Sequence, residues 1–137
     1  MAAGVAERLH RAGERVTPQR LRVARALEAG RQQTAEELWR QLQDRRDEIG
    51  RATVFRSLEA LVSAGLAHRL EREHHVYAYV ACRPEHHHHL ACSACGRVLE
   101  IDESYVLPVA ERVAAETGFV IDDARLDFYG RCRDCRR

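Results

Sequence analysis

Several residue types and patterns are missing from this chain, and each absence narrows what the protein can be. The 137 residues contain no run of 18 apolar residues, which excludes a transmembrane helix. The first 13 residues, MAAGVAERLHRAG, lack the apolar centre of a secretory signal, so we expect a cytoplasmic protein. Lysine and asparagine are absent altogether. Because both use A-rich codons, we attribute this to genomic base composition and draw nothing functional from it.

The chain is uneven along its length. Residues 1–81 contain no cysteine and carry 14 arginines against 11 acidic residues, whereas residues 82–137 hold all five cysteines and carry 8 arginines against 10 acidic residues. Four arginines and no acidic residue lie between Arg15 and Leu27. The basic stretch indicates either a surface for a polyanion or an ordinary solvated helix face.

Four of the cysteines form two C-x-x-C pairs. CSAC spans residues 92–95 and CRDC spans residues 132–135. Two such turns complete a tetrahedral zinc site, and a closed site of four thiolates stabilises a fold without catalysing a reaction. The alternative is a thioredoxin-like redox pair, which leaves the second pair unexplained. We therefore expect a structural Zn²⁺ held by Cys92, Cys95, Cys132 and Cys135.

Four consecutive histidines, His86–His89, precede the first cysteine pair. In a strand, alternate side chains face opposite sides, so His87 and His89 share one face and the other two share the opposite face. Cys82 can fold back as a third ligand, and a thiolate with imidazoles favours zinc over manganese, magnesium or calcium. The alternatives are an affinity tag for the histidines and an ordinary buried thiol for Cys82.

The N-terminal half reads as a series of helices followed by a hairpin. Thr17-Pro18 and Thr34–Glu37 carry helix-start signals, the second of them a capping box. Further helices are predicted at residues 3–12 and 52–64, and two strands at residues 66–70 and 76–80. This order of elements predicts a winged helix-turn-helix.

The outward face of the predicted third helix, together with the basic stretch before it, carries side chains suited to DNA. Arginine binds phosphates and guanine edges, and an aromatic ring or the threonine methyl packs on thymine methyls. A helical module that docks another protein is the alternative. The candidate DNA-binding residues are Arg15, Gln19, Arg20, Arg51, Thr53, Phe55 and Arg56.

The segments RVTPQRLRVARAL, TAEELW, RATVFRSLEALVSAGL, HHHHLACSACGRVLEI and FYGRCRDC, in this order, resemble the ferric uptake regulator superfamily. The resemblance implies an α+β fold, with a winged-helix DNA-binding domain at residues 1–81, a hinge at 82–87 and a small α/β dimerisation domain with the four-cysteine zinc site at 88–137. In that last domain it implies strands near 88–92, 97–101 and 119–129 and a helix near 105–117.

The resemblance is closest to the zinc uptake regulator branch. Iron and peroxide sensors complete their hinge site with a histidine where this chain has Gln32. The zinc branch implies a regulatory metal site instead, drawn here from His68, Cys82, His87 and His89, with Glu100 as a replacement or a further ligand. A third site through His86 and His88 is not expected, because the positions of its other ligands hold Leu107 and Ala124. Phe55 stands where most relatives have tyrosine, so ring stacking is retained and a hydroxyl contact is lost.

The implied function is a repressor, not an enzyme, that acts as a zinc-loaded homodimer on palindromic double-stranded operators of metal-uptake genes. It would hold one structural and one regulatory Zn²⁺ and would involve no membrane and no small-molecule substrate. A manganese-sensing or an iron- or peroxide-sensing repressor of the same superfamily is the alternative, with Mn²⁺ or Fe²⁺ in the regulatory site. A hydrolytic zinc enzyme and a redox chaperone are weaker rivals, since the four-cysteine site is closed.

Overall fold

The computed structural model describes residues 2–44, 47–83 and 85–136. The chain divides into two compact units, Met1–Pro84 and Glu85–Arg137, which are described separately. The hinge predicted at residues 82–87 includes residue 84, which lies outside the described residues. No helix in the described part of the chain is both long and apolar enough to cross a membrane.

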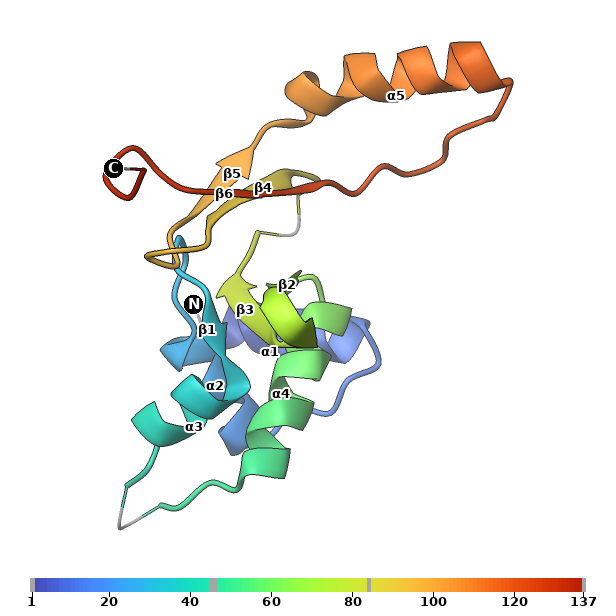
Figure 1. The fold of residues 1–137 in the computed structure, drawn as a ribbon. Helices are drawn as coiled ribbons and strands as arrows, with labels where there is room; N and C mark the ends of the chain where they lie inside the picture. The colour runs from blue at the N-terminus through green and yellow to red at the C-terminus, as the bar shows by residue number, and fades with distance from the viewer. Residues whose placement is uncertain (1, 45–46, 84, 137) are drawn as a thin grey trace. The chain divides into compact units, whose positions relative to one another are not determined.

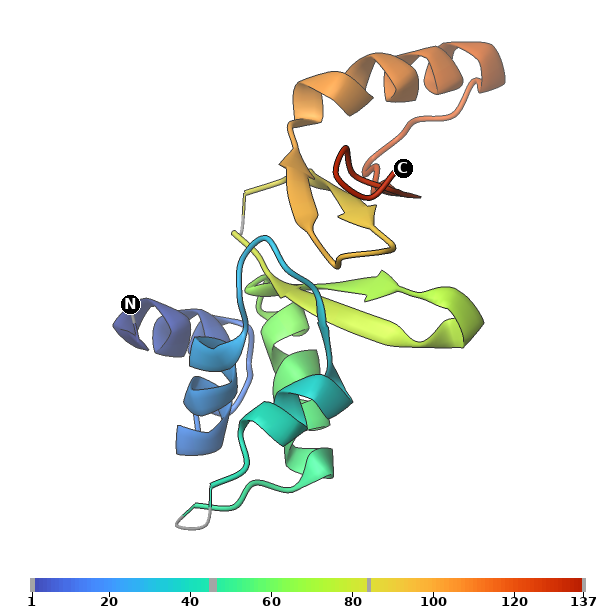
Figure 2. The same ribbon diagram turned by 60° about the vertical axis from the view of Figure 1, so that its left-hand side comes forward.

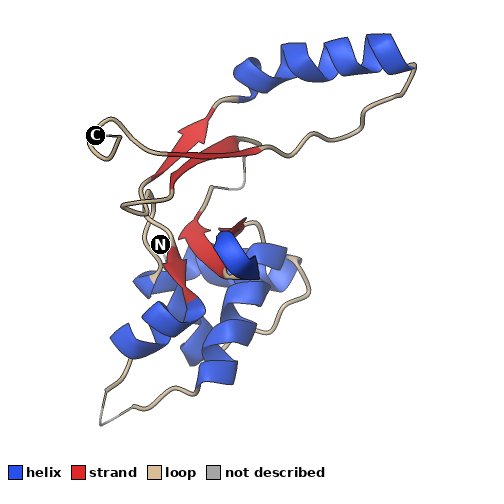
Figure 3. Ribbon diagram, viewed as in Figure 1, coloured by secondary structure: helices blue, strands red, loops and turns tan. Residues whose placement is uncertain are grey.

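The first unit consists of four helices and a small sheet (Figures 1 and 3). Its sheet is antiparallel throughout and has the strand order β1-β3-β2. In chain order its elements are α1 (Ala2–Arg11), α2 (Pro18–Ala26), β1 (Gln33–Thr34), α3 (Ala35–Gln41), α4 (Arg51–Ser63), β2 (Ala67–Glu71), a 3-10 turn (Glu73–His75) and β3 (Tyr77–Ala81). This is the winged helix-turn-helix expected from the sequence, with α4 as its third core helix and the β2–β3 hairpin as its wing.

Local signals in the sequence start these helices where they were expected. The Thr17 hydroxyl accepts from the Arg20 N–H at 3.2 Å, with Pro18 as the first residue of α2. Thr34 and Glu37 form a reciprocal capping box at α3. The two strands of the wing begin and end one residue later than predicted, and the short strand β1 was not predicted.

A single apolar core holds the first unit together. Side chains from all four helices and from both wing strands meet in it, and each fully buried leucine contributes about 1.5–3 kcal/mol. Its most buried members include Leu9, Val23, Leu38, Val54, Leu58, Leu61 and Tyr79. Since α4 packs against α2, α3 and β2 through this core, its opposite face is left to solvent.

The second unit is built around a three-stranded sheet. The strands are β4 (His88–Cys92), β5 (Val98–Ile101) and β6 (Asp127–Gly130), and α5 (Glu103–Thr117) connects β5 to the segment before β6. The order is β5-β4-β6, with β4 antiparallel to β5 and parallel to β6. Figure 2 shows α5 lying to one side of this sheet. Of the described residues of α5, only Val106 is buried.

The strand predicted at residues 119–129 is wrong over most of its length. The structure forms a strand only at Asp127–Gly130, because β6 pairs with β4 and the pairing begins at His89↔Asp127. Within the described part of the chain, residues 119–125 belong to no strand. Phe119 and Val120 in that segment are 73% and 87% exposed. Apolar residues in the segment for which the resemblance implied a strand therefore lie on the surface of this unit.

Candidate metal centre and nucleic-acid interface

The two C-x-x-C turns of the second unit meet at one end of the sheet. Parallel pairing of β4 with β6 sets Cys92 opposite Gly130, so the turn after each strand emerges on the same side. Gly96 closes the first turn with a positive φ of 78°. One ligand atom from each of Cys92, Cys95, Cys132 and Cys135 lies within 4.8 Å of the others.

This spacing fits a tetrahedral metal ion. Four sulfurs about 2.3 Å from a zinc ion lie about 3.8 Å from one another, and the Sγ atoms of Cys95 and Cys132 are 3.9 Å apart. The Cys132 N–H also donates to the Cys92 sulfur at 3.3 Å. The residues therefore fit a closed site of four sulfurs, which would hold the end of β4 to the end of β6.

Ionisation of the four thiols is unequal. Backbone N–H donors, that of Cys132 above all, lower the pKa of Cys92 to about 6. The side-chain hydrogen bond with Cys132, with burial second, raises the pKa of Cys135 to about 12. The thiolate of Cys92 is therefore favoured by the protein's own donors, whereas Cys135 needs a cation to ionise beside it.

The first face of the histidine run gathers His87 and His89 with two carboxylates. The centroids of the two imidazole rings are 4.7 Å apart. Glu100 and Asp127 are the residues paired with His89 on β5 and β6. The Glu100 carboxylate lies 3.6 Å from Nε2 of His87, and the Asp127 carboxylate lies 3.5 Å from Nδ1 of His89. The two histidines share one face, as predicted. On this face the second unit brings together imidazole nitrogens and carboxylate oxygens, both of which are atoms that can bind a metal.

The opposite face holds a cluster that the sequence did not reveal. His86 and His88 stand 5.0 Å apart between ring centroids, and both contact one oxygen of Glu103, at 3.0 and 2.7 Å. Glu103 lies on the first turn of α5, one turn before the Leu107 position at which the resemblance placed a ligand. These three residues are close enough to share an ion.

The hydrogen bonds of His88 indicate which of its two ring nitrogens carries the proton. The Leu126 N–H donates to Nδ1 of His88 at 3.2 Å. A backbone N–H can only donate, so Nδ1 is the acceptor and Nε2 carries the proton that is donated to Glu103. The buried His88, 1% exposed, therefore ties β4 to α5 and to the segment before β6 by hydrogen bonds.

Two proposed ligands of the hinge site, and Gln32 at the position where iron and peroxide sensors have a histidine, belong to the first unit. His68 lies on β2 opposite Val80 and is half-buried. Cys82 follows β3 directly, and its N–H donates to the Leu66 carbonyl at 3.0 Å. Gln32 is buried, and its side-chain oxygen accepts from Arg72 at 3.2 Å. Gln32 thus ties the start of the sheet to the wing, which is a structural role.

The surface of α4 bears the DNA-binding candidates as expected from helical periodicity. Arg51, Phe55 and Arg56 are exposed, with Phe55 at 50%, and Thr53 is half-buried. An exposed aromatic ring with an arginine on either side of it in the sequence suits contact with base methyls and phosphates.

The other three candidates lie in the first turn of α2 or just before it, and they differ in how exposed their side chains are. Arg15 and Gln19 are exposed. Arg20 is half-buried, donates to the Arg15 carbonyl at 2.7 Å and pairs with Glu14 at 3.4 Å. Both contacts use Nη1 of Arg20 and hold this side chain against the loop that carries Arg15.

A winged helix with two exposed arginines on its third core helix, joined to a unit that carries two histidine clusters and a four-sulfur site, defines a metal-responsive DNA-binding regulator. Comparison with known proteins makes the assignment specific. Residues 11–129 match the model of the ferric uptake regulator family. The chain belongs to this family and is therefore a metal-dependent transcription regulator and not an enzyme.

Individual relatives include both iron and zinc regulators. The ferric uptake regulation protein of Synechococcus elongatus is 33% identical over 140 residues, covering 99% of this chain and 95% of that protein. The zinc uptake regulation protein of Mycobacterium tuberculosis is 36% identical over 126 residues, covering 91% and 97%. A solved zinc uptake regulator complexed with zinc and DNA is 27% identical, with a TM-score of 0.72, and the match covers 97% of this chain and 91% of that one. These relatives support DNA binding and metal binding without distinguishing the metal.

Proposed function

We propose that the protein is a zinc-sensing repressor that binds palindromic operators of metal-uptake genes as a zinc-loaded homodimer. The observation that carries the choice of metal is the position of Cys82, the one cysteine outside the four-sulfur cluster, directly after the wing strand β3. A thiolate with imidazoles is a donor set for zinc, whereas manganese prefers oxygen.

The regulatory site in this proposal takes ligands from both units. His87 and His89 come from the second unit, and His68 and Cys82 come from the first. Glu100 either completes the set or replaces His68. A metal bound by all of them fixes the angle between the units, and with it the spacing of the two α4 helices in a dimer. By linkage, operator DNA then tightens zinc binding by the same factor by which zinc tightens DNA binding.

The dimer in this proposal is formed by the second unit. Its surface exposes large apolar side chains that the unit's own fold leaves uncovered: Tyr105 is 75% exposed, Val109 is 54% exposed and Phe119 is 73% exposed. A second copy covering them gains about 25 cal/mol for each Å² of apolar surface removed from water. Sedimentation of the Val109→Glu variant as a monomer, against a dimeric parent, is the expected result. A monomeric parent contradicts the proposal.

Two carboxylates beside the histidines favour the second candidate, a manganese- or iron-sensing repressor. Glu100 and Asp127 offer the oxygen ligands that these harder ions accept. In that case His87, His89 and the carboxylates form the site, and Cys82 takes no part.

Cobalt(II) distinguishes the two candidates. It is added to protein that retains its structural zinc, with Cys82→Ser as the test variant and His75→Gln, on the exposed wing tip, as the matched control. Zinc sensing predicts an intense tetrahedral d–d band with sulfur-to-metal charge transfer, lost in Cys82→Ser and kept in His75→Gln. A weak octahedral spectrum that ignores Cys82 favours manganese or iron.

DNA binding is measured in parallel on a duplex selected from random sequence by the zinc-loaded protein. We expect zinc to tighten binding about 5- to 150-fold, which corresponds to a coupling of about 1–3 kcal/mol. Cys82→Ser should lose this response and keep the weak zinc-free binding. Equal affinity with and without regulatory zinc contradicts the switch.

A further inference from the structure

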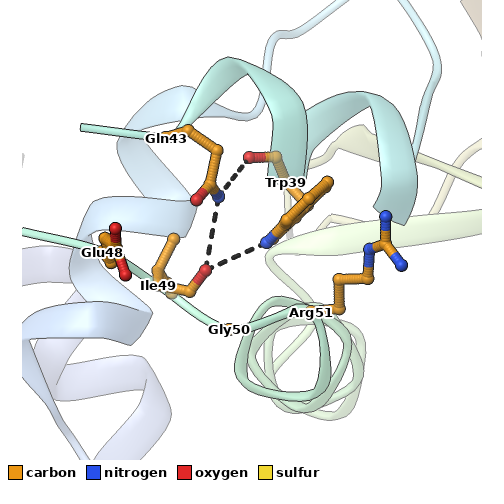
Figure 4. A pocket seen from close by; sticks show the side chains of 6 residues that line it. All are labelled: Trp39, Gln43, Glu48, Ile49, Gly50 and Arg51. Atoms are coloured by element: carbon orange, nitrogen blue, oxygen red, sulfur yellow. Dashed lines mark hydrogen bonds between the residues drawn. The ribbon is translucent and has the colours of Figure 1, made fainter. Parts of the chain in front are cut away.

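Arg51, the first residue of α4, is held in place by two residues of α3. Its guanidinium carbon lies 4.1 Å from the centroid of the Trp39 ring, and its Nη2 lies 3.2 Å from a carboxylate oxygen of Glu36. Figure 4 shows the side chains of Arg51 and Trp39 beside each other near the start of α4. An arginine on a helix surface is ordinarily free to sample many rotamers. The contacts with Trp39 and Glu36 restrict the rotamers of Arg51.

The ring beneath Arg51 is itself fixed. The Trp39 indole N–H donates to the Ile49 carbonyl at 3.0 Å. The Gln43 amide donates to the Trp39 carbonyl at 2.7 Å and to that of Ile49 at 3.3 Å (Figure 4). These bonds join the end of α3 to the segment that leads into α4. Trp39 also packs against the apolar core on its buried side.

Stacking leaves the hydrogen-bonding edges of the guanidinium available. A ring contacts the flat face of the group, whereas the N–H donors lie in its plane. The Arg51 side chain keeps 64% of its surface exposed. Glu36 uses one of these donors and also pairs with Arg40 at 3.4 Å, so it can exchange its bond to Arg51 for the one to Arg40.

We propose that Trp39 is a positioning residue for DNA binding: its ring holds Arg51 in the conformation that binds a DNA phosphate, and Glu36 occupies the place of that phosphate until DNA displaces it. The inference rests on the proposed use of α4 as the DNA-binding helix. A prepositioned arginine loses less conformational freedom on binding than a mobile one, which strengthens the complex.

Trp39 differs in burial from Leu38 and Leu42, the two leucines nearest it in the sequence. The structure separates their roles. Leu38 is fully buried and Leu42 is 8% exposed, whereas Trp39 is only half-buried. Its exposed part is the surface on which Arg51 stacks, so a smaller apolar residue would complete the core and still lose this contact.

A double-mutant cycle in operator binding tests the proposal. Zinc-loaded full-length protein is titrated onto the selected duplex at several salt concentrations. We expect Trp39→Leu to weaken binding about two- to fivefold, as an exposed cation–π contact supports. Arg51→Ala should weaken it by at least as much and reduce the slope of log affinity against log salt by about 1. In the Arg51→Ala background, Trp39→Leu should have no further effect.

Two variants separate positioning from a structural role of Trp39. Trp39→Phe keeps an aromatic face and removes the bond to Ile49, so it should retain most of the affinity. Glu36→Gln should tighten binding in the parent and do so less in the Arg51→Ala background. Circular dichroism confirms that each variant is folded. Independent losses from Trp39→Leu and Arg51→Ala, or a Phe variant as weak as the Leu variant, overturn the proposal.

Arg56→Ala distinguishes failure of this inference from failure of the DNA-binding face. If Arg51→Ala and Arg56→Ala both leave affinity unchanged, α4 does not contact DNA and the proposed interface is wrong. If both weaken binding but Trp39→Leu does not, the interface stands and positioning by Trp39 is refuted.

Discussion

Replacing Tyr79 by phenylalanine tests how the wing is fixed to α4. Tyr79 lies on β3 and is 1% exposed, and its hydroxyl donates to a Glu59 oxygen at 2.6 Å. Glu59 lies on α4 and also pairs with Arg69 of β2 at 3.5 Å. One carboxylate thus joins both wing strands to α4, and Tyr79→Phe removes the more buried of its two bonds.

The expected loss in the free energy of unfolding is about 1–1.5 kcal/mol at pH 7. A hydrogen bond to a charged group contributes about 1.5–3 kcal/mol. The Glu59 side chain is 35% exposed, so water replaces part of the bond in the variant. The expected loss therefore lies at or just below the lower end of that range. Trp39 is the single tryptophan of the chain, and its fluorescence reports unfolding of the first unit in urea.

Alkaline pH gives a second measure of the same bond. Burial, and then the hydrogen bond to Glu59, raise the pKa of Tyr79 well above its ordinary value. Because the folded pKa exceeds the unfolded value of about 10, this stability is complete below pH 10 and falls by about 1.4 kcal/mol per pH unit above it. The parent should therefore lose its advantage over Tyr79→Phe by about pH 11.

Tyr77→Phe is the matched control, because Tyr77 lies on the same strand with its side chain 41% exposed. It should unfold at the parent's urea concentration at every pH. If Tyr79→Phe matches the parent at pH 7, or if its deficit persists unchanged at pH 11, the bond to Glu59 does not hold the wing as argued.

Three further variants test the core, a helix cap and the metal centre. Leu58→Ala, at a fully buried position of α4, should cost about 2–5 kcal/mol in urea unfolding, and a loss below 1 kcal/mol contradicts the packing described. Thr34→Ala removes one half of the capping box and should cost about 1 kcal/mol, whereas Thr34→Ser should restore stability to near that of the parent. Cys95→Ser should lower the tightly bound zinc by one ion per chain and lower the midpoint of thermal unfolding, and an unchanged zinc content measured by mass spectrometry rules out the four-sulfur site.

Much of the fold was predictable because its signals are local. A capping residue and the donor it binds lie three positions apart, as Thr17 and Arg20 do. Helical and strand periodicities repeat within a few residues. The paired C-x-x-C turns carry their chemistry in their own spacing, so the sequence alone predicted four clustered cysteines.

Contacts that depend on strand register were not predictable in this way. Asp127 stands beside His89 only because β6 pairs with β4 in one particular register. Glu103 reaches His86 and His88 because α5 begins just after β5, which lies next to β4. A shift of one residue in register turns each side chain to the other face, and no nearby residue in the sequence records which register is chosen.

By itself, then, the sequence determined the winged helix, the four-cysteine cluster and the outward face of α4, because each follows from neighbours within a turn or a repeat. Only the tertiary structure decided that β6 is short, that Glu103 completes a second histidine cluster, and that Trp39 supports Arg51. Each of these depends on which elements pack together, and packing joins residues 12 to 38 positions apart whose contact no local pattern specifies.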